Sequence, residues 1–160
     1  LDKTGYMRQA LSMGGYYESW SQSGEVFFDN HNDKFGAAYC NMMSANSMIG
    51  NLLLPAIASI EINYFGKTAD DTAKLVAQYF GDEAAEELTN VYYRYAVENP
   101  FYFLEYALGF SIYQQELRAA QETCEGNFDY RSFVETYLNL GPTYFNISMP
   151  IMDEWINEHR

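Results

Sequence analysis

Apolar side chains recur along most of this chain at intervals of three and four residues, the spacing that places them on one face of an α-helix. The segment from Pro100 to Gly109 differs, because it is apolar or aromatic on every side and Glu105 is its only charge. That pattern predicts a helix that other helices enclose. From Phe110 to Ala120 the apolar positions narrow to one face. We therefore expect a central helix that starts buried and ends half exposed.

Helical patterns also lie on both sides of this central helix. One of them is interrupted near Pro55, because proline lacks the amide hydrogen and clashes with the preceding turn. The expected helices span residues 1–13, 16–29, 35–64 in two parts or with a kink, 70–80, 82–99, 129–141 and 148–156. We find no convincing strand, internal repeat or low-complexity segment. The sequence thus predicts an all-α bundle of about eight helices joined by short turns.

Capping residues mark several of the expected helix ends. Thr68 and Asp71 have the spacing of a capping box, in which each side chain bonds the backbone amide of the other residue. Asp82 and Asp129 are the expected N-caps of two later helices. Ser148, with a proline two residues later, is expected to begin the last one.

Length and composition indicate one folded domain. The chain has 160 residues, of which 48% are hydrophobic and 18% aromatic, enough to bury a substantial core. Its formal charge of −13 and its 9 scattered basic residues disfavour nucleic acids and anionic membranes as partners, because both are negatively charged. No unbroken run of about 20 apolar residues occurs, so we expect no transmembrane segment.

The two cysteines leave the cellular compartment open. Cys40 and Cys124 have no metal-type spacing, so they form either a disulfide or, as the favoured interpretation, two buried thiols. The N-terminal residues lack the charged-then-apolar pattern of a targeting segment. Because the chain starts at Leu1 and not at methionine, we expect it to be a fragment of a longer protein. A signal peptide upstream would make that protein extracytoplasmic or cell-surface, and without one it would be cytoplasmic.

Three segments carry a family resemblance when they are taken in order. The first is Glu18-Ser-Trp20 with Glu25, the second is PFYFLEYALG over 100–109, and the third is FDYRSF over 128–133, continuing to Gly141-Pro142. Together they resemble the motifs E-G-W-A-x-Y-x-E, P-x-x-x-L-x-Y-x-x-G and F-D-L-x-x-F-x-x-x-L-x-x-G-x-P in the C-terminal third of a bacterial zincin-like metallopeptidase family, domain of unknown function 885. The resemblance covers most of the chain, roughly residues 16–155. It implies that this bundle is the C-terminal part of a zincin-like peptidase fold.

The resemblance implies roles for three residues. Glu18 occupies the position of the family's glutamate zinc ligand, which would join two histidines and leave one position for the water that zinc acidifies. Glu25, seven residues later, would help to orient the ligands. Tyr106 would be the catalytic residue that donates a hydrogen bond to the oxyanion. The implied reaction is hydrolysis of a peptide substrate, with zinc bound in the full-length protein.

The histidine motif that supplies the other zinc ligands does not occur in this sequence. Only His31 and His159 are present, both interpreted as solvated, and Ser59 and Asn63 stand where many family members carry aspartate and histidine. We therefore expect no tight zinc binding and no activity from this chain alone. Our first hypothesis is the C-terminal helical portion of a zinc-dependent peptidase. It would contribute Glu18 and part of the cleft wall to the missing N-terminal part of the same protein, unless the chain is a degenerate copy.

The second hypothesis is a non-catalytic helical module that binds a peptide or a partner domain in a tyrosine-lined groove. In that case Glu18 and Glu25 are ordinary acids on a helix surface, and Tyr106 is part of the core.

A group of acidic residues opens the expected helix over residues 82–99. Negative charge suits the N-terminal end of a helix dipole. We interpret the group as a solvated face, with metal or ligand binding as the alternative. Its members are Asp82, Glu83, Glu86 and Glu87.

Overall fold

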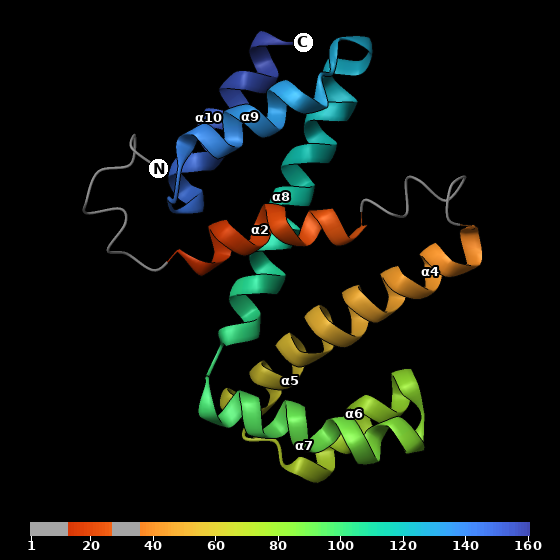
Figure 1. Ribbon diagram of the computed structural model, residues 1–160. Helices are drawn as coiled ribbons and strands as arrows, with labels where there is room; N and C mark the ends of the chain where they lie inside the picture. Colours follow the sequence, from red (N-terminus) through yellow and green to blue (C-terminus); the bar gives the residue numbers. More distant parts are fainter. Residues whose placement is uncertain (1–12, 27–35) are drawn as a thin grey trace. The chain divides into compact units, whose positions relative to one another are not determined.

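The computed structural model describes residues 13–26 and 36–160, and the side chains of all of these except 25, 26 and 44–47 (Figure 1). All regular secondary structure in this part of the chain is helical, which confirms the all-α class. The chain divides into two compact units. The terminal unit comprises Leu1–Ser23 and Leu108–Arg160, and the middle unit comprises Gly24–Ala107. The expectation of a single domain stays a prediction, because the units are defined by contacts and not by independent folding.

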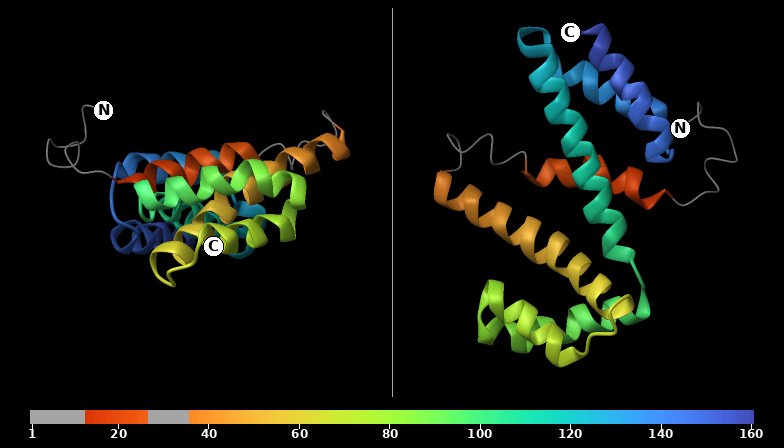
Figure 2. Two further views of the ribbon diagram at one scale, coloured as in Figure 1. Left: turned by 90° about the horizontal axis from the view of Figure 1, so that it is seen from below. Right: turned by 180° about the vertical axis from the view of Figure 1, so that it is seen from behind.

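The middle unit is built from consecutive helices, of which α6 and α7 form an antiparallel hairpin that packs on α5 (Figure 2). The helices are α4 (Ala37–Ala45), η2 (Asn46–Leu53), α5 (Leu54–Asn63), α6 (Ala69–Phe80) and α7 (Asp82–Glu98). Its core comes from one face of α5, α6 and α7. The buried members are Leu54, Ala58, Ile62, Val76, Ala85, Tyr92 and Ala96.

The predicted interruption near Pro55 is present as a change of helix type. The π-helix η2 ends at Leu53, and α5 begins with Pro55 in its first turn. Because proline has no amide hydrogen, a backbone oxygen of the preceding helical turn loses its donor there. The hydroxyl of Tyr92 donates to the backbone oxygen of Gly50 in η2. This bond fastens α7 to the wider turn of the π-helix.

The stretch from Ala37 to Asn63 is, among the described residues, long and apolar enough to cross a membrane by length and composition, with a mean hydropathy of 1.3 over its most apolar window. Half of that window is buried inside the structure. A buried core helix satisfies the same criterion, so this is weak evidence for a span.

The caps of the hairpin confirm one expectation and correct another. Thr68 and Asp71 form the predicted capping box, and the hydrogen bond from the Thr68 backbone amide lowers the pKa of the Asp71 carboxyl. Asp82 is not an N-cap. Gly81, at φ 85°, ends α6 and also occupies the N-cap position of α7, so Asp82 becomes the first residue of the helix. Glycine reaches this backbone conformation without strain.

The terminal unit packs α2, the second part of α8, α9 and α10 around aromatic rings. The elements are α2 (Gly14–Val26), α8 (Tyr102–Cys124), η3 (Glu125–Asn127), α9 (Tyr130–Leu140) and α10 (Phe145–Glu158). Asp129 caps α9 as predicted, accepting a hydrogen bond from the Arg131 amide.

The Tyr16 ring stacks on Tyr137 at 5.0 Å, and its hydroxyl donates to the Tyr137 backbone oxygen at 3.1 Å. Burial raises the pKa of Tyr16 to about 12.

Two expectations about α8 and the last helix are wrong. The start of α8 is not enclosed, because Tyr102 and Leu108 are 44% and 52% exposed. Tyr102 packs on Phe103 and Tyr106 of the same helix, and Phe103 also packs on Tyr95 of α7. The last helix begins at Phe145, before Ser148, and contains Pro150 in its interior.

The cysteines are buried and free, as the favoured interpretation predicts. Cys40 is 1% exposed and Cys124 is 2% exposed. The Cys124 thiol donates to the backbone oxygen of Ile156 at 3.6 Å, so it serves as a small core side chain between α8 and α10.

Candidate functional site

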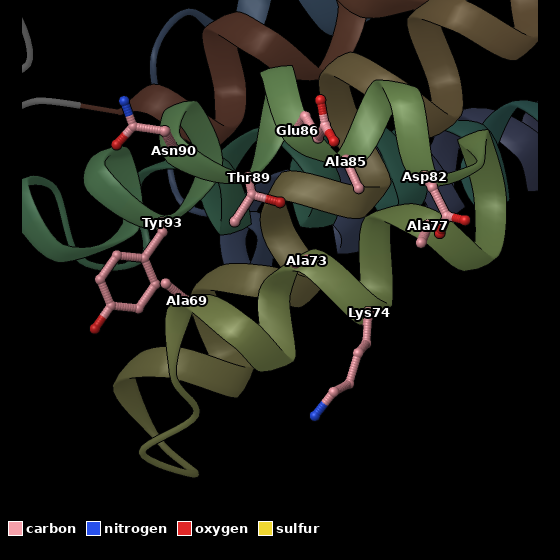
Figure 3. Close-up of a pocket in the computed structure, with 10 residues that line it drawn as sticks. All are labelled: Ala69, Ala73, Lys74, Ala77, Asp82, Ala85, Glu86, Thr89, Asn90 and Tyr93. Carbon is pink, nitrogen blue, oxygen red and sulfur yellow. The ribbon is translucent and has the colours of Figure 1, made fainter.

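A groove of about 540 Å³ runs between α6 and α7 (Figure 3). This volume falls in the range of binding sites for small ligands and short peptide segments. The groove is lined by Ala69, Ala73, Lys74 and Ala77 from α6 and by Asp82, Ala85, Glu86, Thr89, Asn90 and Tyr93 from α7. All ten residues belong to the middle unit.

The groove exists because the side of α6 that faces it carries alanines, whose small side chains leave the space between the helices unfilled. Ala69, Ala73 and Ala77 recur every four residues, which aligns them along one face of the helix. A neighbouring face carries Val76, which is fully buried in the core. Val76 thus packs in the core of the middle unit, and the alanines leave a shallow apolar channel beside Ala85 of α7.

One polar group in the groove has no partner in the described residues. The Thr89 hydroxyl oxygen is buried and makes no hydrogen bond, and Figure 3 shows this side chain pointing from α7 into the space between the helices. A buried hydroxyl without a partner costs about 1–3 kcal/mol. A ligand that supplies a donor or an acceptor would remove that cost, because a hydroxyl can do either.

The charged residues that line the groove are one base on α6, Lys74, and two acids on α7, Asp82 and Glu86. Lys74 is paired with Asp71 at 3.6 Å, and its ammonium group extends away from the channel in Figure 3. Asp82 and Glu86 are exposed and are in no ion pair within the described residues. The acidic side of the groove is therefore open to a cation.

The predicted zinc ligand Glu18 lies half-buried on α2, in the terminal unit. Its Oε2 accepts a hydrogen bond from Ser21 Oγ at 3.2 Å, a contact within one helical turn. Glu25 lies in the last turn of the same helix, and its side chain is outside the described part. His31 is outside it as well. No group of three metal-ligating side chains comes together among the described residues.

The predicted catalytic residue Tyr106 lies on α8, in the middle unit. Its hydroxyl shares a hydrogen bond of 2.5 Å with the hydroxyl of Tyr102. Glu18 and Tyr106 belong to different units, so the shared peptidase site that their implied roles require stays a prediction.

Ser59 and Asn63, which the resemblance places at aspartate and histidine positions, make hydrogen bonds to the backbone. Ser59 Oγ is buried and accepts from the Phe101 amide at 3.0 Å. Asn63 Nδ2 donates to the backbone oxygens of Ser59 and Ala96, each at 2.9 Å. These bonds hold the end of α5 against α7 and the turn before α8.

His159 is partly exposed, and it also makes contacts that the interpretation as a solvated side chain did not include. Its ring stacks on Trp155 at 4.1 Å with an interplanar angle of 19°. Its Nδ1 also makes a hydrogen bond of 2.8 Å with the Trp155 backbone oxygen. The ring therefore caps the end of α10 and is not placed to bind a metal with other ligands.

Glu116 is a buried acid that the sequence analysis missed. It is 8% exposed and its Oε2 has no hydrogen-bond partner in the described residues. Burial and then the nearby Asp153 raise the pKa of this carboxyl. The spacing could have revealed it, since Glu116 lies three residues after buried Tyr113 and four before buried Ala120.

We expect Glu116→Gln to change how the stability of the chain depends on pH. Because the folded state raises the pKa of Glu116, it binds the proton more tightly than the unfolded state. The free energy of unfolding should therefore fall as pH rises from about 4.5 through the folded pKa. Glutamine cannot lose a proton and so removes this decline. The difference in free energy of unfolding between the variant and the unsubstituted chain should therefore be more favourable to the variant at pH 7 than at pH 4. Urea unfolding at both pH values measures the change, with exposed Glu122→Gln as control. The same change in free energy of unfolding between pH 4 and pH 7 for both variants would contradict the prediction.

Comparison of the chain with protein-family models, with curated proteins and with solved structures finds no match.

Proposed function

We propose that this chain is a non-catalytic helical module that binds a helical segment of a partner protein in the groove between α6 and α7. The observation that carries the proposal is the groove itself. Ala69, Ala73 and Ala77 of α6 form its alanine floor, and the hydroxyl of Thr89 lies in it without a partner among the described residues. Insertion of an amphipathic helix into a groove between helices is a common mode of peptide recognition.

The dimensions of the groove support a helix of about three turns. The alanines on α6 span residues 69–77 and the lining on α7 spans residues 82–93, which correspond to about 12 and 16 Å at 1.5 Å per residue. Alanine side chains also permit close approach of a third helix, because interaxial distance depends on the side chains at the contact. Binding of a peptide by β-strand addition would need a strand edge, and the described residues contain no strand.

The metallopeptidase hypothesis stays a prediction from the family resemblance. It requires zinc ligands and a general base from outside this sequence, in which Glu18 would be one ligand. The sequence upstream of the chain in its gene tests it, because a glutamate-and-histidine motif must be encoded there.

Selection from a displayed library of helical peptides tests the interaction-module proposal. Peptides that bind the full chain should lose at least tenfold in affinity for Ala73→Leu, because the added side chain fills the groove. The matched control is Ala119→Leu, an exposed alanine of α8 away from the groove, which should leave binding unchanged. Peptides that bind both variants equally well, or a library that yields none, would overturn the proposal.

A further inference from the structure

We infer that the segment bound in the groove is a cationic amphipathic helix whose basic side chains contact Asp82 and Glu86. This inference rests on the proposed function and adds the chemistry of the partner. Asp82 and Glu86 lie four residues apart on α7 and both line the groove. They are therefore on one face of the helix, one turn apart.

The cation that already lies at the groove does not neutralise these carboxylates. Lys74 pairs with Asp71 of its own helix. Two more exposed acids, Glu83 and Glu87, flank the pair on α7 and extend the negative surface beyond the groove. A partner with lysine or arginine on its polar face would gain favourable interactions along the first two turns of α7.

Charge also argues against a second copy of this chain as the occupant. The formal charge is −13, because 22 acidic residues outnumber 9 basic ones. Bringing two such surfaces together places like charges side by side, which is unfavourable. A partner of the opposite sign fits the groove better.

The apolar side of the partner is constrained by the alanine floor. Small or medium aliphatic side chains would contact Ala73 and Ala77, because the channel is shallow and open on one side. One polar side chain at the centre of the partner would reach the Thr89 hydroxyl, which has no partner of its own. The inferred recognition pattern is apolar residues at helical spacing with basic residues one turn away.

Two synthetic peptides of about 14 residues test this inference. Both carry alanine and leucine on one helical face, and their polar faces carry lysine in one peptide and glutamine in the other. The lysine peptide should bind the full chain about tenfold more tightly at low salt, since two exposed ion pairs contribute modestly and are screened by salt. The double variant Asp82→Asn with Glu86→Gln should abolish the difference between the peptides.

The control is the double variant Glu83→Gln with Glu87→Gln, which removes the same charge from the same helix outside the groove. It should keep most of the preference for lysine. Equal affinity of the two peptides, with both lost in Ala73→Leu, would overturn the cationic partner and leave the groove function intact. A preference for lysine that the control removes as fully as the groove variant would show a general charge effect and would also overturn the inference.

Discussion

Phe133→Ala is expected to lower the free energy of unfolding of the terminal unit by about 3–5 kcal/mol, the cost of truncating a fully buried aromatic side chain. Phe133 is 0% exposed. Its ring contacts those of Trp155 at 5.5 Å, Tyr113 at 6.0 Å and Phe128 at 6.1 Å between centroids. Alanine would leave a cavity at the point where α8, α9 and α10 meet.

Urea unfolding followed by tryptophan fluorescence measures this effect, because Trp155 belongs to the same cluster. The matched control is Leu138→Ala on the same helix, since Leu138 is 39% exposed and should cost about 1 kcal/mol or less. Equal losses for the two variants would mean that the aromatic cluster is not the core of this unit.

Gly109→Ala is expected to destabilise the chain by about 2 kcal/mol, although alanine is the better helix former. A Cβ at Gly109 would lie 2.3 Å from the backbone oxygen of Gly15, so α2 and α8 would have to move apart where they cross (Figure 2). No side-chain rotation can relieve this contact, because the opposing atoms are backbone.

Gly24→Ala supplies a control of opposite sign. Gly24 lies in α2, and a Cβ there would meet nothing within 4 Å. Alanine should stabilise the helix at this position by about 0.5–1 kcal/mol. Thermal unfolding of both variants measures these changes in stability. A stabilised Gly109→Ala variant would show that the close helix crossing is absent.

Local features of this fold could be predicted from the sequence. Thr68 and Asp71 form their capping box, Asp129 caps α9, and α7 ends at Glu98, within one residue of the expected end at Asn99, because each depends on a few neighbouring residues. The N-cap expected at Asp82 failed for a local reason too, since Gly81 can serve both helices at once.

Burial along α8 and α10 could not be predicted from the pattern alone. Leu108 reads as a core residue but is exposed, whereas Glu116 combines a charged side chain with the spacing of a core position, and the pattern does not say which of the two decides its burial. In each case the outcome depends on which neighbouring helix covers that face. Pro150 within α10 is a similar case, because packing of Met152 and Trp155 in the core stabilises a helix that proline alone would shorten.

The groove was missed because its signal resembles that of a core. Ala73 and Ala77 have the spacing of buried positions, and the acids Asp82 and Glu86 have the pattern of a solvated face. Their combination on two antiparallel helices becomes visible only when α6 folds back on α7. The roles predicted for Glu18, Glu25 and Tyr106 depend on the family resemblance and stay predictions.

The most direct test of the central claim is a ¹⁵N nuclear magnetic resonance titration of the full chain with the lysine-bearing helical peptide. We predict that the largest amide shift changes fall on the residues of α6 and α7 that line the groove, Thr89 among them, and that Ala73→Leu removes them. Shift changes concentrated on α2 around Glu18, or elsewhere in the terminal unit, with the α6–α7 residues unaffected, would contradict it.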